Sequence, residues 1–482
     1  MTDWTLTVGL EVHVELKTKT KMFCGCANDP FNSRPNINVC PVCYGLPGAL
    51  PLLNKEAVRL TVELGQALDG KIAPTSFWAR KNYFYPDLPK GYQISQSTSP
   101  LVEHARIEID GVKHQIQRIH LEEDAGKSIH STGSSGSLVN YNRAGVPLME
   151  MVTEPDFHSA EDAKHFCQEI QRIVRALGIS DADMEKGQMR CEANISVAPS
   201  NWHLAASRTE NGQKPAVRDS EEPSGSRGEA RSQKLGTKVE VKNINSFRAV
   251  EKAIVYEYER QTESLDKGEA VIHETRTWDG ITNKTVSMRS KETSADYRYF
   301  PEPDLPVVAI EVGAVKSKQL PEDRRRALEE VGVPAAIAQS LVDKQLDDRV
   351  LVINSRVPEL SKEAAHLLLE STAFAGLGLD DQLGLLTAKK SSGWTKDTLT
   401  AVTKEIGEGK STEEAISNYS ETFVLEPIIV EVITTNQSAV NDYKSGKENA
   451  IHFLVGQVMA KTKGKANINE VRTELEKYFR GL

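Results

Sequence analysis

Alternating polar and apolar positions mark four segments of the chain as β-strands, because successive side chains of a strand point to opposite faces. The segments span residues 9–16, 117–122, 189–197 and 237–242. Their polar positions are, in chain order, Glu11, His13 and Glu15; Arg118, His120 and Glu122; Arg190, Glu192, Asn194 and Ser196; and Lys238, Glu240 and Lys242. A solvated antiparallel sheet alternates in the same way, so each strand alone supports a site only weakly.

The residue types on these polar faces favour an active site over a solvated surface. Carboxylates recur there among Arg, Lys and His, where a solvated sheet would carry more Thr, Ser and Gln. Carboxylates that converge with an imidazole make an oxygen-rich site for Mg²⁺, and interleaved cations suit the phosphates that Mg²⁺ carries. We therefore predict an open, cradle-like sheet that binds Mg-ATP.

The pattern changes along the chain from mixed strands and helices to helices alone. The mixture of strand and helix patterns over residues 1–295 predicts an α+β catalytic domain built on an antiparallel sheet. Residues 296–333 begin with a proline-rich stretch, which favours an extended loop and linker. Helical patterns predict a helical domain over 334–404 and a helical tail over 405–482. Within the first domain, the segment 198–235 has few apolar residues and is expected to be a mobile insertion.

Four of the six cysteines form two close pairs, Cys24 with Cys26 and Cys40 with Cys43, separated by thirteen residues. Two such pairs can deliver four thiolates to one tetrahedral ion, so they predict a zinc site. Zinc held by four thiolates has no open position for water, and such sites usually stabilise a small fold. The cysteines therefore indicate a scaffold, and a free zinc-dependent hydrolase is disfavoured.

Composition bears on the compartment and the partners. No stretch approaches the roughly 20 apolar residues of a membrane span, and the first residues lack a basic and apolar leader. Six cysteines without a disulfide pattern fit a reducing compartment, so we expect a cytoplasmic protein. The net charge of -9 neither favours nor excludes nucleic acid, because binding depends on where basic groups cluster.

One stretch imitates a phosphate-binding loop without forming one. Ala125-Gly-Lys-Ser128 matches the end of a P-loop, but Leu121 stands where the first glycine would be, and the acidic residues 122–124 fill the cradle. Such carboxylates are better suited to a metal, with Lys127 reaching a phosphate. The alternative is a solvated acidic turn.

Two regions have the composition of nucleic-acid contacts. The segment 79–93 interleaves aromatic and basic residues, which is typical of base stacking and phosphate neutralisation, although an ordered loop would look the same. The segment 438–482 holds eight Lys or Arg against five Asp or Glu in an otherwise acidic chain. Such charge suits a structured RNA if the catalytic domain acts on a tRNA-linked substrate.

Motifs spread along nearly the whole chain resemble the B subunit of the glutamyl-tRNA(Gln)/aspartyl-tRNA(Asn) amidotransferase. They include Gly9-Leu-Glu-Val-His-Val-Glu-Leu, Arg80-Lys-Asn-Tyr-Phe-Tyr-Pro-Asp, His120-Leu-Glu-Glu-Asp-Ala-Gly-Lys, Arg190-Cys-Glu-Ala-Asn-Ile-Ser, Lys242-Asn-Ile-Asn-Ser-Phe and Asp296-Tyr-Arg-Tyr-Phe-Pro-Glu-Pro-Asp. The four cysteines look like the zinc site of many members. The segment 198–235 departs from the usual pattern.

The resemblance implies a fold similar to that of glutamine synthetase, and a reaction in which ATP phosphorylates the side-chain carboxylate of Glu or Asp mis-acylated onto tRNA. Ammonia then displaces the phosphate and forms the amide. The residues expected to act in catalysis are Glu11, His13, Glu122, Glu123, Asp124, Lys127, Arg190, Glu192, Glu240 and Lys242, of which Glu11, His13, Glu123 and Glu240 are expected near Mg²⁺. The expected tRNA contacts are Arg80, Lys81, Tyr83, Tyr85, Lys90, Tyr297, Arg298, Lys444, Lys461, Lys463 and Lys465.

The resemblance also implies partners, an amidase-type A subunit that supplies ammonia and a small C subunit, in a heterotrimer. Two alternatives stay open. One is the archaeal glutamate-specific paralogue, for whose extra inserted domain 482 residues leave little room. The other is a zinc-stabilised tRNA-binding scaffold without catalysis, which would not explain why Glu and His recur on the four polar faces.

Overall fold

The computed structural model describes residues 3–109, 111–130, 136–200, 236–290, 297–312, 320–419, 424–445, 447, 449–462, 466 and 468–480. The chain forms two compact units, Met1–Leu320 and Pro321–Leu482. Most of the predicted insertion 198–235 lies outside the described residues, as do Lys463 and Lys465.

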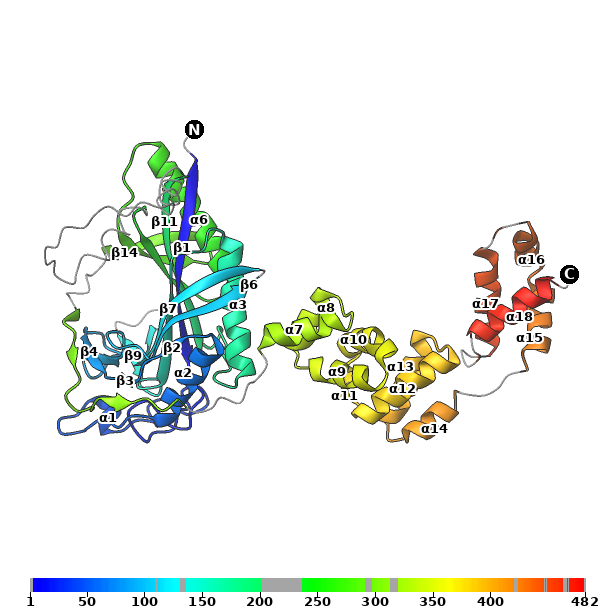
Figure 1. Ribbon diagram of the computed structural model, residues 1–482, viewed down its shortest axis with the longest axis horizontal. Helices are drawn as coiled ribbons and strands as arrows, with labels where there is room; N and C mark the ends of the chain where they lie inside the picture. Colours follow the sequence, from blue (N-terminus) through cyan, green and yellow to red (C-terminus); the bar gives the residue numbers. More distant parts are fainter. Residues whose placement is uncertain are drawn as a thin grey trace, which may run out of the picture. The chain divides into compact units, whose positions relative to one another are not determined.

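A twelve-stranded sheet forms the centre of the first unit (Figure 1). Strand β1 (Trp4–Glu15) lies in its middle, between β10 (Pro147–Thr153) and β11 (Met189–Pro199). Beyond β10 follow β7 (Val112–Glu123), β5 (Tyr92–Ser95), β4 (Ala79–Asn82) and β15 (Phe300–Pro301), with β6 (Val102–Ile109) on β7 and β2 (Lys71–Ile72) on β6. Beyond β11 follow β12 (Val239–Ile244), β13 (Glu274–Asp279) and β14 (Lys284–Ser290).

The sheet is mixed, which corrects the expectation of an antiparallel sheet within the α+β class. Strands β12 and β13 run parallel, and the other pairs are antiparallel. Helix α6 (Phe247–Asp266) connects β12 to β13, and a helical crossover of this kind returns the chain in the same direction. Two small sheets pair β3 (Thr75–Ser76) with β16 (Val308–Ala309), and β8 (Lys127–His130) with β9 (Ser137–Asn140).

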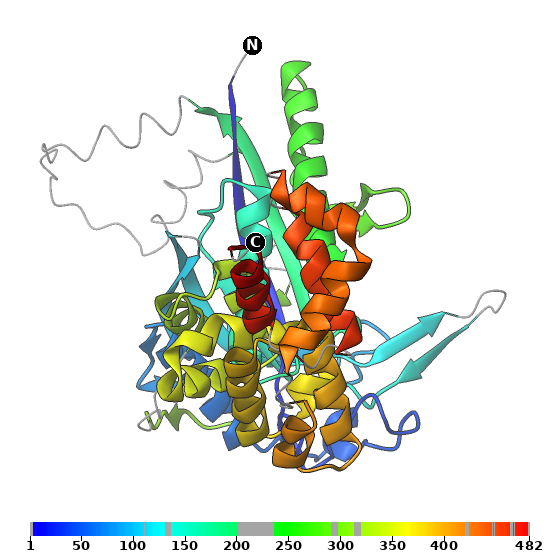
Figure 2. The ribbon, with the colours of Figure 1, turned by 90° about the vertical axis from the view of Figure 1, so that its right-hand side faces the viewer.

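The predicted alternation on β1 is confirmed, because Leu10, Val12 and Val14 are at most 1 % exposed and belong to the main hydrophobic core. Helices α2 (Lys55–Ala67), α3 (Ala160–Ala176) and α6 pack against the sheet. Helix α6 runs beside β1 and β11 (Figures 1 and 2). Asn54, Ser159 and Ser246 cap these helices with side-chain oxygens, each cap being worth about 1 kcal/mol. The helices leave the opposite, polar face of the sheet to the site.

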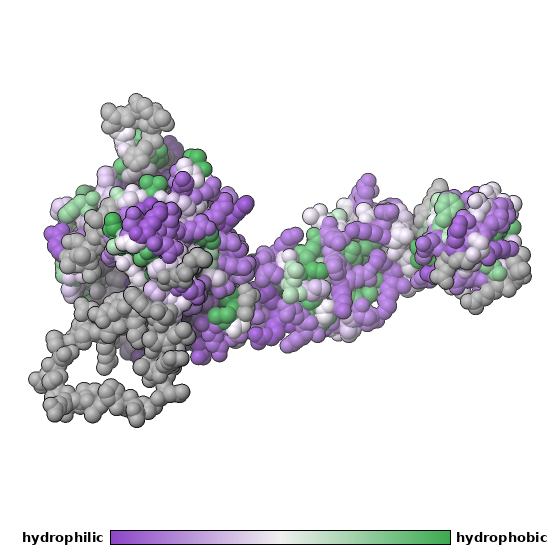
Figure 3. All heavy atoms as spheres, turned by 90° about the horizontal axis from the view of Figure 1, so that it is seen from above, coloured by the Kyte–Doolittle hydropathy of each residue, from purple (hydrophilic) through white to green (hydrophobic). Residues whose placement is uncertain are grey.

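The second unit is helical from Pro321 onward. Its helices are α7 (Pro321–Glu330), α8 (Ala335–Asp343), α9 (Asp347–Arg356), η3 (Pro358–Leu360), α10 (Ser361–Glu370), α11 (Thr372–Gly376), α12 (Leu379–Ser392), α13 (Lys396–Gly407), α14 (Thr412–Ser417), α15 (Leu425–Thr435), α16 (Gln437–Lys444), α17 (Asn449–Lys461) and α18 (Ile468–Arg480). Their buried residues form two clusters, from Leu328 to Ala415 and from Leu425 to Leu475. The predicted boundary at 404–405 falls within α13. Figure 3 shows a mostly hydrophilic surface on the face drawn.

Candidate functional site

Strand register brings polar residues from three strands into one row on the polar face of the sheet. His13 on β1 lies opposite Glu150 on β10, and Glu150 lies opposite His120 on β7. Glu122 follows His120 two positions along β7, and therefore shares its face. Antiparallel neighbours directly opposite each other are close enough for their side chains to interact.

We call His13, Glu122 and Glu150 the histidine–glutamate cluster, because they offer ligand atoms that lie within 4.8 Å of one another. His13 Nε2 lies 3.4 Å from Glu150 Oε2, and His120 Nε2 lies 3.4 Å from Glu122 Oε1 and 3.5 Å from Glu150 Oε2. Both glutamates and His120 are buried. The two carboxylates are hard oxygen ligands of the kind that suit Mg²⁺ or Mn²⁺, and the imidazole adds one borderline nitrogen ligand.

Opposite charges keep these buried carboxyls ionised. Burial alone would raise the pKa of Glu150, but His120 and His13 hold it well below its usual range. Burial opposes ionisation of Glu122 too, and the Lys81 ammonium outweighs it and lowers the pKa of that carboxyl. In turn Glu122 raises the pKa of Lys81 against the effect of burial. Both carboxyls are therefore ionised at neutral pH, as metal ligands must be.

A second group, the carboxylate cluster, consists of Glu11, Glu192 and Glu240, whose ligand atoms also lie within 4.8 Å of one another. Glu11 on β1 lies opposite Glu192 on β11. Lys242 Nζ is 2.8 Å from Glu192 Oε2 and 3.1 Å from Glu240 Oε1, and these carboxylates raise the pKa of Lys242 although burial lowers it. Asn194 donates a hydrogen bond of 2.8 Å to Glu11.

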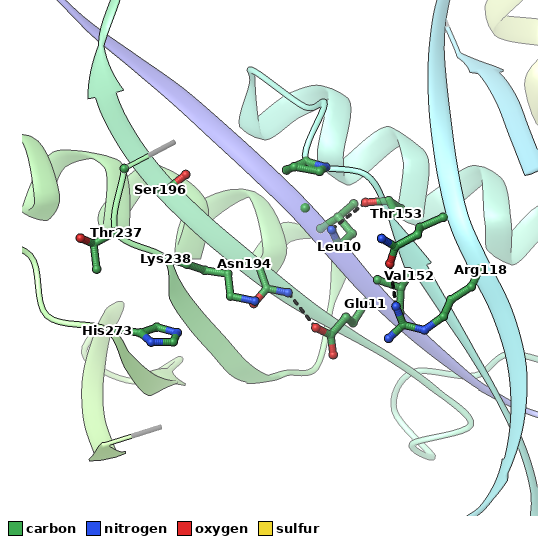
Figure 4. Close-up of a pocket in the computed structure, with 14 residues that line it drawn as sticks. Leu10, Glu11, Arg118, Val152, Thr153, Asn194, Ser196, Thr237, Lys238 and His273 are labelled. Carbon is green, nitrogen blue, oxygen red and sulfur yellow. Dashed lines mark hydrogen bonds between the residues drawn. The ribbon is translucent and has the colours of Figure 1, made fainter. Parts of the chain in front are cut away.

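A cavity of about 580 Å³ adjoins the carboxylate cluster. Glu11 lies in its wall between Arg118 on one side and Lys238 and His273 on the other (Figure 4). The remaining lining comes from β1, β7, β10, β11, the loop after β10 and the residues before β12. This size falls within the roughly 300 to 1,000 Å³ of small-molecule sites, and the mixture of cations with one metal-competent carboxylate suits a phosphorylated ligand.

A third group lies further along β1, where Glu15 contacts Asp124. Arg190 Nη2 is 3.1 Å and Arg143 Nε 3.7 Å from Asp124 Oδ2. Burial opposes ionisation of Asp124, but these two guanidinium groups lower the pKa of that carboxyl. Burial and the neighbouring Asp124 charge raise the pKa of Glu15 to about 8. Glu15 is therefore mostly protonated at neutral pH and can donate a hydrogen bond to Asp124.

The structure divides the expected magnesium set. Glu11 and Glu240 lie in the carboxylate cluster, and His13 lies in the histidine–glutamate cluster. Glu123 belongs to neither group, since its carboxylate pairs with Lys90 and accepts the backbone N–H of Ile94. Neighbouring residues of a strand point to opposite faces, which separates Glu123 from Glu122.

The remaining predicted catalytic residues are placed as follows. Glu122, Arg190, Glu192 and Lys242 belong to the groups described above, as does Asp124. Lys127 lies exposed on the small β8–β9 sheet, outside both clusters. The three groups therefore include all the predicted catalytic side chains except those of Glu123 and Lys127.

The four cysteines converge as the zinc prediction requires. Cys43 Sγ lies 3.2 Å from Cys24 Sγ and 3.7 Å from both Cys40 Sγ and Cys26 Sγ, and all four thiols are free. Zinc–sulfur bonds of about 2.3 Å in a tetrahedron separate the sulfurs by about 3.8 Å, so the group fits zinc. A hydrogen bond from Cys24 and the Lys21 ammonium lower the pKa of Cys43 to about 4 although burial opposes them.

The predicted tRNA contacts in the first unit are mostly engaged within the chain. Arg80 makes a bidentate pair with Glu302, both bonds being 2.7 Å, and stacks 4.4 Å from the Tyr92 ring. Lys90 pairs with Glu123. These cations therefore neutralise carboxylates of their own chain.

The aromatic residues of the same region remain accessible. Tyr83 forms edge-on ring pairs with Tyr85, 6.0 Å away, and with Tyr297, 6.3 Å away. Tyr85 is 52 % exposed, and Phe84 is 78 % exposed. Arg298 adopts a φ of 44° directly after Tyr297. This region is therefore better suited to stack its exposed aromatic rings on bases than to neutralise phosphates with its cations.

In the second unit, Lys444 is exposed at the end of α16. Lys461 ends α17 and pairs with Glu431 at 2.6 Å on the surface. A surface pair of this kind is weak, so it leaves Lys461 able to exchange its partner for a phosphate. Both lysines belong to helices of the cluster 425–475.

The sequence interpretation missed Glu150 and Arg143, and it placed Glu15 and His120 on the polar faces without giving them a catalytic role. Glu150 stands alone in the apolar run Pro147-Leu-Met-Glu-Met-Val-Thr153. A lone carboxylate within a buried strand was the available signal, because such a group is rare without a partner. Arg143 lies in a loop, where no period marks the direction of its side chain.

Comparison with known proteins agrees with this geometry. A family described as "GatB/GatE catalytic domain" matches residues 6–215 and 225–316, and one described as "GatB domain" matches 389–479. Only 216–224 interrupts the first match, so less of the segment 198–235 departs from the family pattern than expected. No helix among the described residues is long and apolar enough to cross a membrane.

Curated relatives match over the full length. The aspartyl/glutamyl-tRNA(Asn/Gln) amidotransferase B subunit of Thermodesulfovibrio yellowstonii is 42 % identical over 97 % of this chain and 98 % of its own length. The proteins of the same name from Crocosphaera subtropica and Thermotoga petrophila are each 39 % identical, over 100 % and 98 % of this chain and 98 % of their own lengths. The chain belongs to the family of aspartyl/glutamyl-tRNA(Asn/Gln) amidotransferase B subunits.

Proposed function

We propose that this chain binds Glu-tRNA(Gln) or Asp-tRNA(Asn), and uses ATP to phosphorylate the side-chain carboxylate of the mis-attached amino acid. Ammonia from a partner subunit then displaces phosphate from the acyl phosphate and forms the amide. The observation that carries the proposal is the pair of metal-competent clusters that share β1, through Glu11 and His13 two positions apart, beside a cavity lined with cations.

A carboxylate resists attack by ammonia because its oxygen is a poor leaving group, so the chain must direct phosphoryl transfer before amidation. Such transfer needs positioning and charge neutralisation more than covalent chemistry. When bound, Mg²⁺ would neutralise the phosphate oxygens and align them for in-line transfer. His13, Glu122 and Glu150 would hold one ion, and the carboxylate cluster would hold another.

The cavity is the proposed ATP site. Arg118 and Lys238 in its wall are placed to contact phosphate oxygens, and Glu11 connects it to the carboxylate cluster. The site would occupy one face of a glutamine-synthetase-like cradle. Asn194 fixes the carboxylate of Glu11 through its 2.8 Å hydrogen bond, and thereby limits the rotamers that a metal ligand could adopt.

The chain requires ammonia from elsewhere, for which we propose the amidase-type A subunit, with a small C subunit completing the heterotrimer. Four cysteines form the zinc-like group, and Cys167 and Cys191 are buried in the main core. The cysteine nucleophile of a glutaminase needs an accessible free thiol, but zinc would bind the four clustered thiols, and Cys167 and Cys191 are buried. The relatives are named as one subunit of an amidotransferase, which supports the presence of partners.

The tRNA would be held at two places. Exposed rings at Phe84 and Tyr85 lie in the segment that also carries Lys81, whose ammonium faces Glu122. Lys444 and Lys461 lie in the C-terminal helical cluster, and we propose that this cluster contacts the body of the tRNA. Sequence-independent phosphate contacts of this kind weaken steeply with salt.

The proposal is tested by trapping the activated substrate. The chain is reconstituted with its A and C partners, ATP, Mg²⁺ and charged tRNA, and hydroxylamine replaces the ammonia donor. We expect a hydroxamate on the Glu or Asp side chain that forms only when ATP is present. Tight tRNA binding without hydroxamate and without ATP consumption would favour the non-catalytic scaffold instead.

A further inference from the structure

Lys21 is an unusual lysine, because its side chain is completely enclosed in the protein. It is 0 % exposed and is the one lysine among the buried residues of the described chain. A buried cation normally has a carboxylate partner, since an isolated charge in the interior costs several kcal/mol. The ion pairs of the described residues do not include Lys21.

The neighbours of the Lys21 ammonium are a thiol and a carbonyl. Nζ lies 3.6 Å from Cys43 Sγ and donates a hydrogen bond of 3.2 Å to the carbonyl of Tyr141. The backbone N–H of Lys21 donates to the carbonyl of Cys26 at 3.0 Å. Both ends of the residue are therefore fixed against the four-cysteine group.

Charge balance explains this placement. Four thiolates and one Zn²⁺ carry a net charge of about −2, which is costly to bury unless a cation lies close by. Without the metal, at most the Cys43 thiolate would offset the ammonium. We propose that Lys21 is the positioning residue of the zinc site, where it neutralises the tetrathiolate and donates a hydrogen bond to the Cys43 thiolate.

The same contacts connect the metal group to the polar face of the sheet. Tyr141 packs edge-on against Tyr44, with ring centroids 5.3 Å apart, and begins the loop that carries Arg143. Arg143 faces Asp124. Zinc loading therefore stabilises this loop through Lys21. The inference rests on the assignment of zinc to the cysteines and does not depend on the ATP chemistry.

The first test compares Lys21→Met with Lys19→Met in the full chain. Methionine keeps most of the volume of the lysine but lacks its charge, and Lys19 is exposed two positions away. Zinc affinity is measured by competition with a chelator of known affinity. We expect the Lys21→Met protein to bind zinc about 10- to 100-fold more weakly, as for other residues that support metal ligands, and the Lys19→Met protein to match the unaltered chain. Equal affinity in both variants, or no zinc binding by the unaltered chain, would overturn the inference.

A second measurement separates charge from packing. Thermal unfolding is followed for the zinc-loaded and the chelator-stripped forms of both proteins. We expect Lys21→Met to lower the midpoint of the loaded form by clearly more than that of the stripped form, where the ammonium faces at most the Cys43 thiolate and not a tetrathiolate site. An equal decrease of the unfolding midpoint in both forms would show that Lys21 contributes only by packing. Lys21→Gln, which keeps a donor without the charge, provides the same comparison if the methionine variant does not fold.

Discussion

Among single residues, Glu150 connects the two histidines of the polar face. We expect Glu150→Gln to lower tRNA-dependent ATP turnover by about 100-fold or more, because it removes a charged ligand from the histidine–glutamate cluster. Turnover is measured by ADP release in the reconstituted complex. Glu154→Gln is the matched control, four positions along the chain and outside the cluster. Equal turnover in the two variants would show that Glu150 does not act in the site.

Period-two alternation predicted the polar face of each strand, and with it most of the candidate site. It could not show which strands are neighbours, so it did not separate Glu11 and Glu240 from His13. The two clusters form because β1 pairs with β10 on one side and with β11 on the other. These pairings join residues more than 130 positions apart in the sequence. Glu123 stays a prediction as a metal ligand, although the alternation directs it away from Glu122, whose Oε1 lies 3.4 Å from His120 Nε2.

Among the elements, the short helix α1 (Pro41–Tyr44) is followed by Gly45, which lies close to Lys90, the residue that pairs with Glu123. Gly45 ends α1 with a φ of 64°, and a Cβ there would lie 2.4 Å from Lys90 Cγ and 3.1 Å from Lys90 Cα. We expect Gly45→Ala to displace Lys90 from Glu123 and to lower amide formation by about 10-fold or more. Amide product on the tRNA is measured with glutamine as donor.

Gly48→Ala is the control for Gly45→Ala. Gly48 also has a positive φ, of 82°, but an added Cβ would meet nothing within 4 Å. Backbone strain of about 1 to 2 kcal/mol is thus common to both variants, and only Gly45→Ala crowds Lys90. Equal losses of amide formation would show that strain alone is responsible.

A buried carboxylate attaches α6 to the outer strands of the sheet. Glu257 is 0 % exposed, lies 2.8 Å from Arg260 Nη2 and 3.1 Å from Arg276 Nε, and accepts a hydrogen bond from Thr285. We expect Glu257→Gln to destabilise the first unit by about 1.5 to 3 kcal/mol, because Arg260 loses its charged partner and Arg276 keeps only Glu274. Urea unfolding of the full chain measures the change, and exposed Glu259→Gln should leave it unaltered.

Across the whole molecule, the catalytic sheet and the two helical clusters have separate cores. We expect a chain that ends at Tyr419 to keep the first helical cluster, which closes at Ala415, and to bind tRNA about 10-fold or more weakly because Lys444 and Lys461 are lost. Binding is measured at two salt concentrations. Unchanged affinity would place the tRNA contacts elsewhere on the chain.

The change from mixed to helical periodicity indicated the order of the units, but helix α7 begins at Pro321, inside the predicted linker 296–333. A division of the helical part was predicted at 404–405, whereas the two clusters separate between Ala415 and Leu425, because apolar periodicity continues through α13 and α14 without a compositional break. The parallel β12–β13 pair also escaped prediction, since alternation records which face a side chain takes and not the direction of the neighbouring strand.

The most direct test of the central claim is ADP release by the reconstituted complex with Mg²⁺ and ATP, in the absence of any ammonia donor, with and without charged tRNA. We expect release that requires the charged tRNA, and that is lost in both Glu150→Gln and Glu192→Gln, one variant for each cluster. Release that persists in both variants, or that does not depend on the charged tRNA, would contradict a carboxylate-activating site on this sheet.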